Sequence, residues 1–189
     1  MPRLSIARPP ARPSTDGQHA RRERMLRAAA RLGSRLPLER VQMSEVATEA
    51  GVALGTLYRY YPSKHHLFAG LLMTRMSQLD APLGRGPDAV ADVLTGACRA
   101  LLARPRLARA MLTSVNMVRA EQPAQGETGL RDLIAEVAGT DDLALARIVE
   151  QTAYGVLTWA AAGEITADQA EADLRRACAL LLAGLERPA

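Results

Sequence analysis

The sequence predicts an all-α fold of about nine helices, for three reasons. Of its 189 residues 48% are hydrophobic and only 3% aromatic, so the core must consist mainly of Leu, Ala, Val and Met. Alanine and leucine favour helices, whereas strands favour aromatic and β-branched residues. Apolar residues recur at helical spacing, and no segment alternates convincingly as a strand.

Three short helices are expected after an N-terminal arm. Residues 1–18 are rich in Pro and Arg and are predicted to form a disordered basic arm. A first helix, with arginines on one side, is expected over residues 19–33, where Gly33 supplies its end. The second begins close to Ser44 and ends at Gly51, because glycine tolerates the positive φ of a helix terminus. The third covers residues 53–60.

The chain is expected to divide into a first domain over residues 19–65 and a larger helical domain over residues 66–189. Ser63 is a good N-cap for a fourth helix that joins the two domains. That helix is expected to end in a turn over residues 80–87, which is rich in Pro and Gly. Further helices are predicted over residues 88–103, 105–119, 128–137, 141–162 and 166–185.

Charge is distributed unevenly along the chain. Residues 1–80 hold 13 Lys and Arg against 6 Asp and Glu, whereas residues 121–189 hold 5 against 12. This asymmetry predicts that the N-terminal part faces a polyanion, the alternative being chance.

Several classes of protein are not expected. Cys98 and Cys178 lack metal-ligand or CxxC spacing, so buried free thiols are favoured over a disulfide. The chain shows no signal-peptide pattern and no apolar run of about 18 residues, which predicts a cytoplasmic protein without membrane contact. It has no P-loop, GxSxG or HExxH motif, so no enzyme, cofactor or metal site is predicted. His65 and His66 adjoin Lys64, which favours phosphate proximity or simple exposure.

Residues 43–60 predict a helix-turn-helix, a unit that places its second helix in the major groove of DNA. Apolar residues are expected to bury one side of this unit, namely Val46, Ala47, Ala50, Val52 and Leu57. The candidate DNA contacts are Ser44, Leu54, Gly55, Thr56, Tyr58, Arg59, Tyr60 and Lys64.

Four of these candidates carry hydroxyl groups. Ser44 and Thr56 lie at helix starts, where a hydroxyl can bond phosphate while the helix dipole adds attraction. Simple N-capping is the alternative for Ser44. Tyr58 and Tyr60 can offer phenol hydroxyls to phosphates, and the alternative is that both are core tyrosines.

The other four candidates differ in chemistry. Arg59 can contact guanine O6 and N7 with its two-pronged head, or a phosphate instead. Gly55 allows close approach of the backbone and Leu54 can meet a thymine methyl, although either residue can simply make a compact turn. Lys64, the only lysine of the chain, would pair with one phosphate at the start of the fourth helix.

With these residues laid out, the stretch resembles the DNA-binding motif of the TetR family of bacterial repressors. The family pattern is close to A-x-x-A-G-V-S-x-G-T-L-Y-x-Y/H-F-x-x-K-x-x-L. Here it reads Ala47-Thr-Glu-Ala-Gly-Val-Ala-Leu-Gly-Thr-Leu-Tyr-Arg-Tyr-Tyr-Pro-Ser-Lys-His-His-Leu67. Ala53 stands where the family often has serine, and Tyr61 where it commonly has phenylalanine.

The resemblance implies a DNA-binding domain, a larger helical domain with a ligand pocket, and a homodimer built mainly from the last two helices. It also implies a palindromic operator of double-stranded DNA. Within the family, the motif is similar to that of the actinobacterial repressors of sterol catabolism, whose inducers are CoA thioesters of steroid intermediates.

The second domain carries no diagnostic motif, so its ligand contacts are inferred from chemistry alone. The apolar candidates are Met76, Cys98, Leu102, Met111, Val115 and Trp159, and the alternative is ordinary core packing. The polar candidates are Asn116, Gln151, Tyr154 and Thr158, and the alternative is hydrogen bonding between helices. A cluster of Arg104, Arg106 and Arg109 can meet an anionic group or form a solvated face.

The dimer is expected to use small residues of the last two helices together with Leu174, Cys178, Leu181, Leu182 and Leu185. The alternative is that these helices only close the monomer core. The predicted function is a ligand-responsive repressor that a small, largely hydrophobic inducer, such as an acyl- or steroid-CoA thioester, releases from DNA. The alternative is a constitutive architectural DNA-binding protein that senses no ligand.

Overall fold

The computed structural model describes residues 15–79, 82, 84–121 and 129–186. These residues form nine α-helices and two short 3-10 helices without any strand, which confirms the predicted all-α fold. In chain order the elements are α1 (Asp16–Arg35), η1 (Leu38–Arg40), α2 (Met43–Ala50), α3 (Leu54–Tyr60), α4 (Lys64–Met76), α5 (Pro87–Leu102), α6 (Pro105–Glu121), α7 (Gly129–Ala138), α8 (Leu143–Ala162), α9 (Ala167–Leu181) and η2 (Ala183–Glu186).

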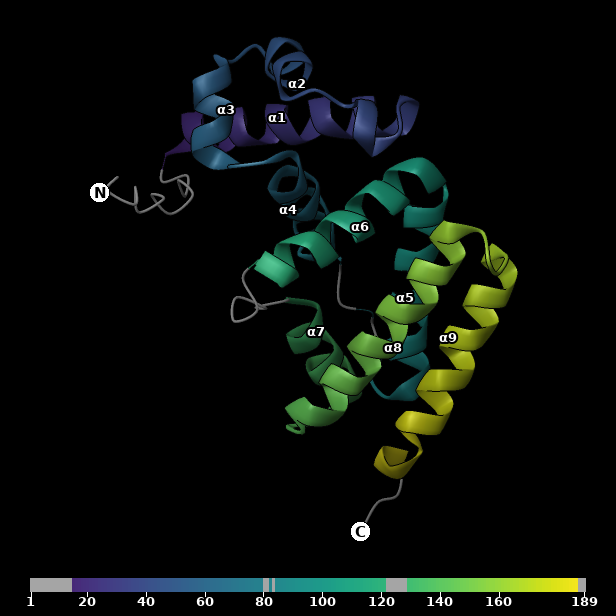
Figure 1. Ribbon diagram of the computed structural model, residues 1–189. Helices are drawn as coiled ribbons and strands as arrows, with labels where there is room; N and C mark the ends of the chain where they lie inside the picture. Colours follow the sequence, from purple (N-terminus) through teal and green to yellow (C-terminus); the bar gives the residue numbers. More distant parts are fainter. Residues whose placement is uncertain (1–14, 80–81, 83, 122–128, 187–189) are drawn as a thin grey trace, which may run out of the picture.

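The helices form a small head and a larger body (Figure 1). Helices α1, α2 and α3 make the head at one end of the molecule, and α5 to α9 make the body. Helix α4 follows the head and packs against α6 of the body, so it joins the two parts. Helices α8 and α9 pack against each other along one side, and α9 also covers α5.

Helix α1 is longer at both ends than the sequence predicts. The Thr15 hydroxyl accepts a hydrogen bond from the amide of Gln18 at 3.4 Å, so the helix already begins at Asp16. Residues 16–18 are therefore helical and do not belong to a disordered arm, while residues 1–14 of that arm lie outside the described part. The predicted stop at Gly33 is wrong, because the helix continues to Arg35.

Gly33 is required by packing rather than by helix termination. A Cβ atom at this position would lie 2.5 Å from Cε1 of the Phe68 ring, closer than van der Waals contact allows. The missing side chain thus lets α1 and α4 approach each other. Phe68 is fully buried at this contact.

The predicted turn between the second and third helices is confirmed at Gly51. This glycine has φ of 64°, in the left-handed region that favours glycine, and its amide donates to the carbonyl of Thr48 at 3.1 Å. At the other end of α2, Gln42 and Glu45 form a capping box. Both ends of helix α2 are therefore capped, and the turn at Gly51 determines where α3 begins.

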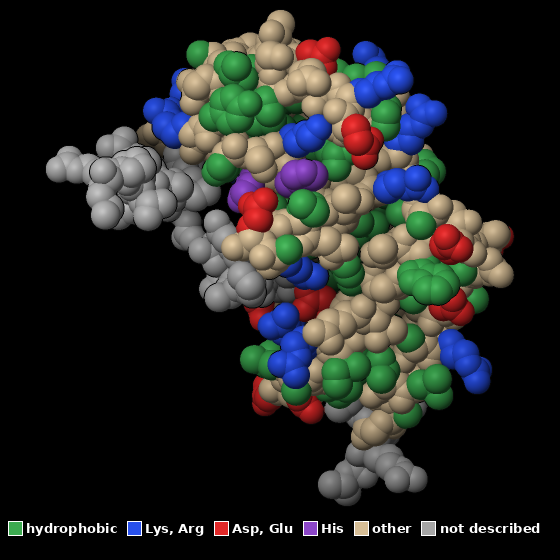
Figure 2. All heavy atoms as spheres, viewed as in Figure 1, with side chains coloured by type: hydrophobic (Ala, Val, Ile, Leu, Met, Phe, Trp, Pro, Cys, Tyr) green, Lys and Arg blue, Asp and Glu red, His purple; other side chains and the backbone are tan. Residues whose placement is uncertain are grey.

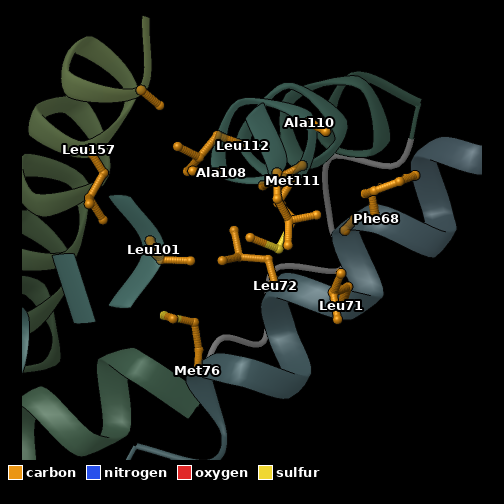
Figure 3. Close-up of a cluster of buried hydrophobic side chains, with 14 of the residues drawn as sticks. Phe68, Leu71, Leu72, Met76, Leu101, Ala108, Ala110, Met111, Leu112 and Leu157 are labelled. Atoms are coloured by element: carbon orange, nitrogen blue, oxygen red, sulfur yellow. The ribbon is translucent and has the colours of Figure 1, made fainter. Parts of the chain in front are cut away.

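Helix α4 begins at the predicted N-cap, since the Ser63 hydroxyl accepts from the amide of His66 at 3.3 Å. The helix buries one face that includes Phe68, Leu71 and Leu72, and Figure 3 shows Leu72 pointing toward Met111 of α6. The later helices lie close to their predicted ranges. The largest difference is at the last helix, where α9 ends at Leu181 and a 3-10 turn follows.

Removing the Tyr61 hydroxyl should be neutral or stabilising by up to about 1 kcal/mol. This hydroxyl is buried without a hydrogen bond of normal geometry, and burial raises the pKa of Tyr61, although the nearby Arg22 guanidinium offsets part of the rise. Urea unfolding of Tyr61→Phe measures the change. Tyr154→Phe is the control, because that hydroxyl donates to the Leu112 carbonyl at 2.8 Å and its loss should cost about 1 kcal/mol. Equal losses in both variants would contradict the prediction.

Cys98 and Cys178 are buried free thiols, as predicted. Burial raises the pKa of both, that of Cys178 from an ordinary value of 9.0 to about 11. Because the thiolate is the reactive form, neither should react with a disulfide reagent at about pH 8 until the protein unfolds. As the folded pKa of Cys178 is raised, its contribution to stability is present below about pH 9 and is lost between about pH 9 and 11. Rapid labelling of the native protein would contradict this prediction.

Within the described residues, no helix combines the length and apolar character needed to cross a membrane.

Candidate nucleic-acid interface and ligand cavity

The outer face of α3 presents large apolar side chains to the surroundings. Leu54 and Tyr58 are 41% and 45% exposed, and their four-residue spacing places them on the same side of the helix. Gly55 lies between them, and a Cβ atom there would meet nothing within 4 Å. Hydrophobic side chains gather over this part of the head, with basic side chains near them (Figure 2). Such a face is typical of a binding surface.

Arg59 is exposed, whereas its neighbour Tyr60 is buried. The Arg59 guanidinium lies 5.8 Å from the centre of the Tyr60 ring, close enough for a cation–π interaction. Tyr60 is only 4% exposed, so it belongs to the core of the head. Most of the Tyr60 side chain therefore packs in the core, while its role as a DNA contact stays a prediction. The ring also supports the side chain of Arg59.

Ser44 and Thr56 lie in the first turns of α2 and α3, and neither is an N-cap. Gln42 occupies the N-cap of α2, so the alternative that Ser44 caps this helix is wrong. Ala53 precedes α3 without a side-chain cap, which leaves the start of α3 open. Ser44 is exposed and Thr56 is half-buried.

Lys64 is held within the protein by two backbone carbonyls. Its Nζ donates to the carbonyl of Leu38 at 3.0 Å and to that of Glu39 at 3.2 Å. Both carbonyls belong to η1, so this side chain fastens the connection between α1 and α2 to the start of α4. Sequence reasoning did not foresee this structural role.

Several arginines of α1 are engaged within the head. Arg24 Nε donates to the Ala50 carbonyl at the end of α2 at 3.2 Å, and Arg31 forms an ion pair with Glu49. The positive side chains therefore lie beside the C-terminal end of α2, where helix carbonyls lack partners. Part of the basic side of α1 thus stabilises the helix-turn-helix.

An apolar cavity of about 50 Å³ lies inside the body. It is lined by helices α4, α5, α6, α7 and α8, and Figure 3 shows Leu72, Met76 and Leu101 around it. Its lining residues are Leu72, Met73, Met76, Leu94, Ala97, Leu101, Leu112, Val115, Arg119, Leu130, Glu150, Ala153, Tyr154 and Leu157. Of the predicted ligand contacts, the structure brings together Met76, Val115 and Tyr154 here.

The other predicted apolar contacts lie elsewhere. Cys98 and Met111 are fully buried but are not part of the cavity wall, and Leu102 is half-buried outside it. Trp159 is 61% exposed on α8, so it points away from the cavity. Apolar character alone could not separate cavity wall from ordinary core, because both require the same side chains.

The remaining polar candidates are also outside the cavity. Gln151 is exposed, while Asn116 and Thr158 line a groove on the surface between α6 and α8. Thr158 donates its hydroxyl hydrogen to the Tyr154 carbonyl at 2.8 Å, a bond within α8. Asn116 Oδ1 accepts from the Tyr154 hydroxyl at 3.0 Å, a bond between α6 and α8 that fits the alternative of hydrogen bonding between helices.

Two charged residues at the cavity wall were missed by sequence reasoning. Glu150 is 6% exposed, and its Oε2 accepts from Nε and Nη2 of Arg131 at 3.1 and 3.0 Å. The Arg119 guanidinium lies 5.0 Å from the centre of the Tyr154 ring. Burial raises the pKa of Tyr154, and Arg119 lowers it in part. A glutamate within the apolar sequence of α8 was the available signal, since such a group needs a partner.

The exposed side of α8 and α9 carries a second set of apolar residues. These large exposed side chains are Leu143, Ile148, Trp159 and Leu180. By contrast, Leu174, Cys178 and Leu182 are at most 1% exposed within the single chain. They close the monomer core, so the prediction that they supply area to a dimer is corrected.

No group of three or more His, Cys, Asp or Glu side chains suited to a metal ion occurs within the ranges that the structure describes.

The small head, the tight turn at Gly51 and the exposed face of α3 define a helix-turn-helix protein. The chain matches the family described as "Bacterial regulatory proteins, tetR family" over residues 25–71. It matches "Tetracyclin repressor-like, C-terminal domain" over residues 85–181. This protein therefore belongs to the TetR family of bacterial transcriptional regulators.

Individual relatives agree with this assignment. The chain is 36% identical over 149 residues to the HTH-type transcriptional repressor KstR of Rhodococcus jostii, covering 72% of this chain and 70% of that protein. It is 45% identical over 71 residues to KstR of Mycobacterium tuberculosis, which covers 38% of this chain and 32% of that protein.

Solved structures share the fold. A TetR transcriptional regulator from Rhodococcus sp. RHA1 superposes with a TM-score of 0.82 at 41% identity, over 92% of this chain and all of that one. Thermus thermophilus FadR, a TetR family repressor in complex with lauroyl-CoA, superposes with a TM-score of 0.60 at 22% identity, over 89% of this chain and 98% of that one. At 22% identity, the similarity to FadR supports only a shared fold.

Proposed function

We propose that this protein is a ligand-responsive transcriptional repressor that binds a palindromic operator as a homodimer. The observation that carries the proposal is the exposed face of α3, where Leu54 and Tyr58 remain uncovered on a rigid helix-turn-helix. Its family membership supports the same conclusion. A DNA-binding repressor of this kind would act in the bacterial cytoplasm.

The proposed DNA surface combines base and phosphate contacts. Arg59 would read a guanine through O6 and N7, and Leu54 would contact a thymine methyl. Gly55 would let the backbone approach the groove, while hydroxyl groups and Lys64 would bind phosphates. The proposed set is Ser44, Leu54, Gly55, Thr56, Tyr58, Arg59, Tyr60 and Lys64.

The proposed dimer uses the exposed side of α8 and α9. Trp159 and Leu180 are 61% and 68% exposed, large for apolar residues on a free surface. A second copy would bury them in a contact of four helices. Two-fold symmetry would then place the two α3 helices in major grooves about one helical turn apart.

The proposed inducer is a largely hydrophobic molecule, such as an acyl- or steroid-CoA thioester. The apolar wall of the cavity supports this class of ligand, and FadR, which shares the fold, is in complex with lauroyl-CoA. The cavity holds only about 50 Å³, whereas sites for small molecules usually hold about 300–1,000 Å³. Binding would therefore have to spread the surrounding helices apart.

This expansion would provide the link to DNA. Leu72, Met73 and Met76 of α4 form part of the cavity wall, and the same helix follows α3 after only three residues. A ligand that binds the expanded body more tightly than the closed one would shift α4 and change the spacing of the two α3 helices.

Operator binding at fixed salt tests the proposal directly. Genome-wide mapping of binding sites would supply the operator DNA. Fluorescence anisotropy with that DNA should show binding that a steroid-CoA thioester or lauroyl-CoA weakens. Light scattering should show a dimer at micromolar concentration. If the intact protein binds no DNA in this measurement, the proposal that it is a transcriptional regulator is wrong. Binding that no CoA thioester, sterol or fatty acid alters would favour the architectural alternative.

Filling the cavity should separate DNA binding from ligand response. Ala153 is 2% exposed and lines the cavity, so Ala153→Leu adds three carbon atoms to a space of about 50 Å³. We expect this variant to keep operator affinity and to need about tenfold more ligand for release. Ala144→Leu, at an exposed position of the same helix, is the matched control and should behave as the unchanged protein. A normal ligand response of Ala153→Leu would place the ligand elsewhere.

A further inference from the structure

The N-terminal end of α6 lies where the head meets the body. In Figure 1 it lies beneath the C-terminal end of α1 and beside the C-terminal end of α8. Arg106 Nη1 donates to the carbonyl of Arg35, the last residue of α1, at 3.2 Å. Arg109 donates from Nε to the Ala161 carbonyl at 3.1 Å and from Nη2 to the Ala162 carbonyl at 2.8 Å. Two arginines of α6 thus hold the ends of two other helices.

The same two arginines line a cleft of about 410 Å³. Its other walls come mainly from the turn at Pro37, Leu38 and Glu39, and from α6 itself. No residue of this cleft lines the internal cavity of the body, so the two spaces are separate. The volume falls within the range usual for a site that binds a small molecule.

The charge and shape of the cleft select for an anion. Arg106 and Arg109 contribute two guanidinium groups, against one carboxylate from Glu39. A guanidinium presents its donors in a planar fork that matches carboxylate or phosphate oxygens. Leu38 and Ala110 also line the cleft and make part of its wall apolar. The ligand that fits this arrangement carries one anionic group on a short apolar body.

We propose that this cleft is a second ligand site, which binds a small organic anion with a carboxylate or a phosphate monoester. The anion would replace helix-end carbonyls as the acceptor for Arg106 and Arg109, because bonds between two charged groups are stronger. Since Arg106 also holds the end of α1, the ligand competes with a contact between head and body. The site shares no lining residue with the internal cavity.

The cleft is also distinct from the proposed DNA surface. Helix α3 lies beside the N-terminal half of α1, whereas Arg35 ends that helix on the opposite side of the head (Figure 1). An anion bound by Arg59 and one bound in the cleft can therefore be told apart by substitution.

Calorimetric titration of the full chain without DNA, at constant ionic strength, tests the proposal. The probes are phenyl phosphate and benzoate, with phenol as their uncharged counterpart. We expect saturable binding of at least one anion and none of phenol at the same site. Replacing both arginines, Arg106→Gln with Arg109→Gln, should weaken anion binding about tenfold or more.

Three single variants complete the experiment. Arg59→Gln removes a charge from the DNA surface. Arg104→Gln removes one from the residue before Pro105, which does not line the cleft, so both variants should bind the anion as the unchanged protein does. Glu39→Gln removes the opposing carboxylate and should tighten binding, which keeps the test valid if the double variant fails to fold. The proposal is overturned if the unchanged protein binds neither anion, if a folded double variant binds equally well, or if Glu39→Gln gives no gain.

Discussion

Phe68→Ala should lower the free energy of unfolding by about 3–5 kcal/mol. The Phe68 side chain is fully buried where α1, α4 and α6 meet, and its ring lies against Gly33 of α1. Truncation removes apolar contacts and leaves a cavity that rigid neighbouring helices cannot close. Urea unfolding followed by circular dichroism measures the loss. Phe68→Leu, which retains most of the volume, should lose less.

A second substitution shows whether the Phe68 ring itself restricts position 33. In the unchanged protein, Gly33→Ala should cost about 1–3 kcal/mol, because the new Cβ would lie 2.5 Å from the ring. In the Phe68→Ala background the same change should cost less, since the ring has gone and the contact with Cδ1 of Leu107, at 3.0 Å, remains. Additive losses in the double variant would show that the two positions do not constrain each other.

Arg59→Ala should weaken binding to the best operator sequence by about 1–3 kcal/mol, roughly 5- to 150-fold. The side chain is exposed on α3 and lies over the Tyr60 ring, so it projects from a rigid base. Loss of a two-pronged contact to guanine should reduce the preference between operator sequences. Anisotropy titrations with a set of single-base operator variants measure that preference.

The comparison with Arg59→Lys separates charge from shape. Lysine keeps the positive charge but lacks the planar fork, so it should recover general affinity without full discrimination between bases. An equal loss on all sequences, together with a smaller dependence of affinity on salt, would assign Arg59 to a phosphate contact.

Local signals in the sequence were sufficient for the helices and the turn. Gly51 and Ser63 act through their own backbone or side chain on neighbouring amides and carbonyls, so their roles could be predicted from short stretches. The helical spacing of apolar residues predicted which segments form helices. The same pattern could not predict which helices pack against each other, because the spacing of apolar residues within one helix carries no information about its neighbour.

The errors follow from this limit. Gly33 was interpreted as a helix stop, although its role depends on a ring 35 residues away in the chain. Chemical type alone suggested Trp159 and Met111 as ligand contacts, yet Trp159 is 61% exposed and Met111 is fully buried outside the cavity wall. Burial of these residues is decided by packing between helices. The wall of the internal cavity could not be predicted for the same reason.

Helix α4 packs against both α1 of the head and α6 of the body, and this limits how parts of such proteins can be exchanged. A hybrid regulator joined between residues 65 and 66, at the predicted domain boundary, would cut within the first turn of this helix. It would pair the Gly33 of one parent with the residue that stands at position 68 in another. An exchange of sensing bodies should therefore keep α1, α4 and the facing surface of α6 from the same parent, so that parts from different regulators still fit.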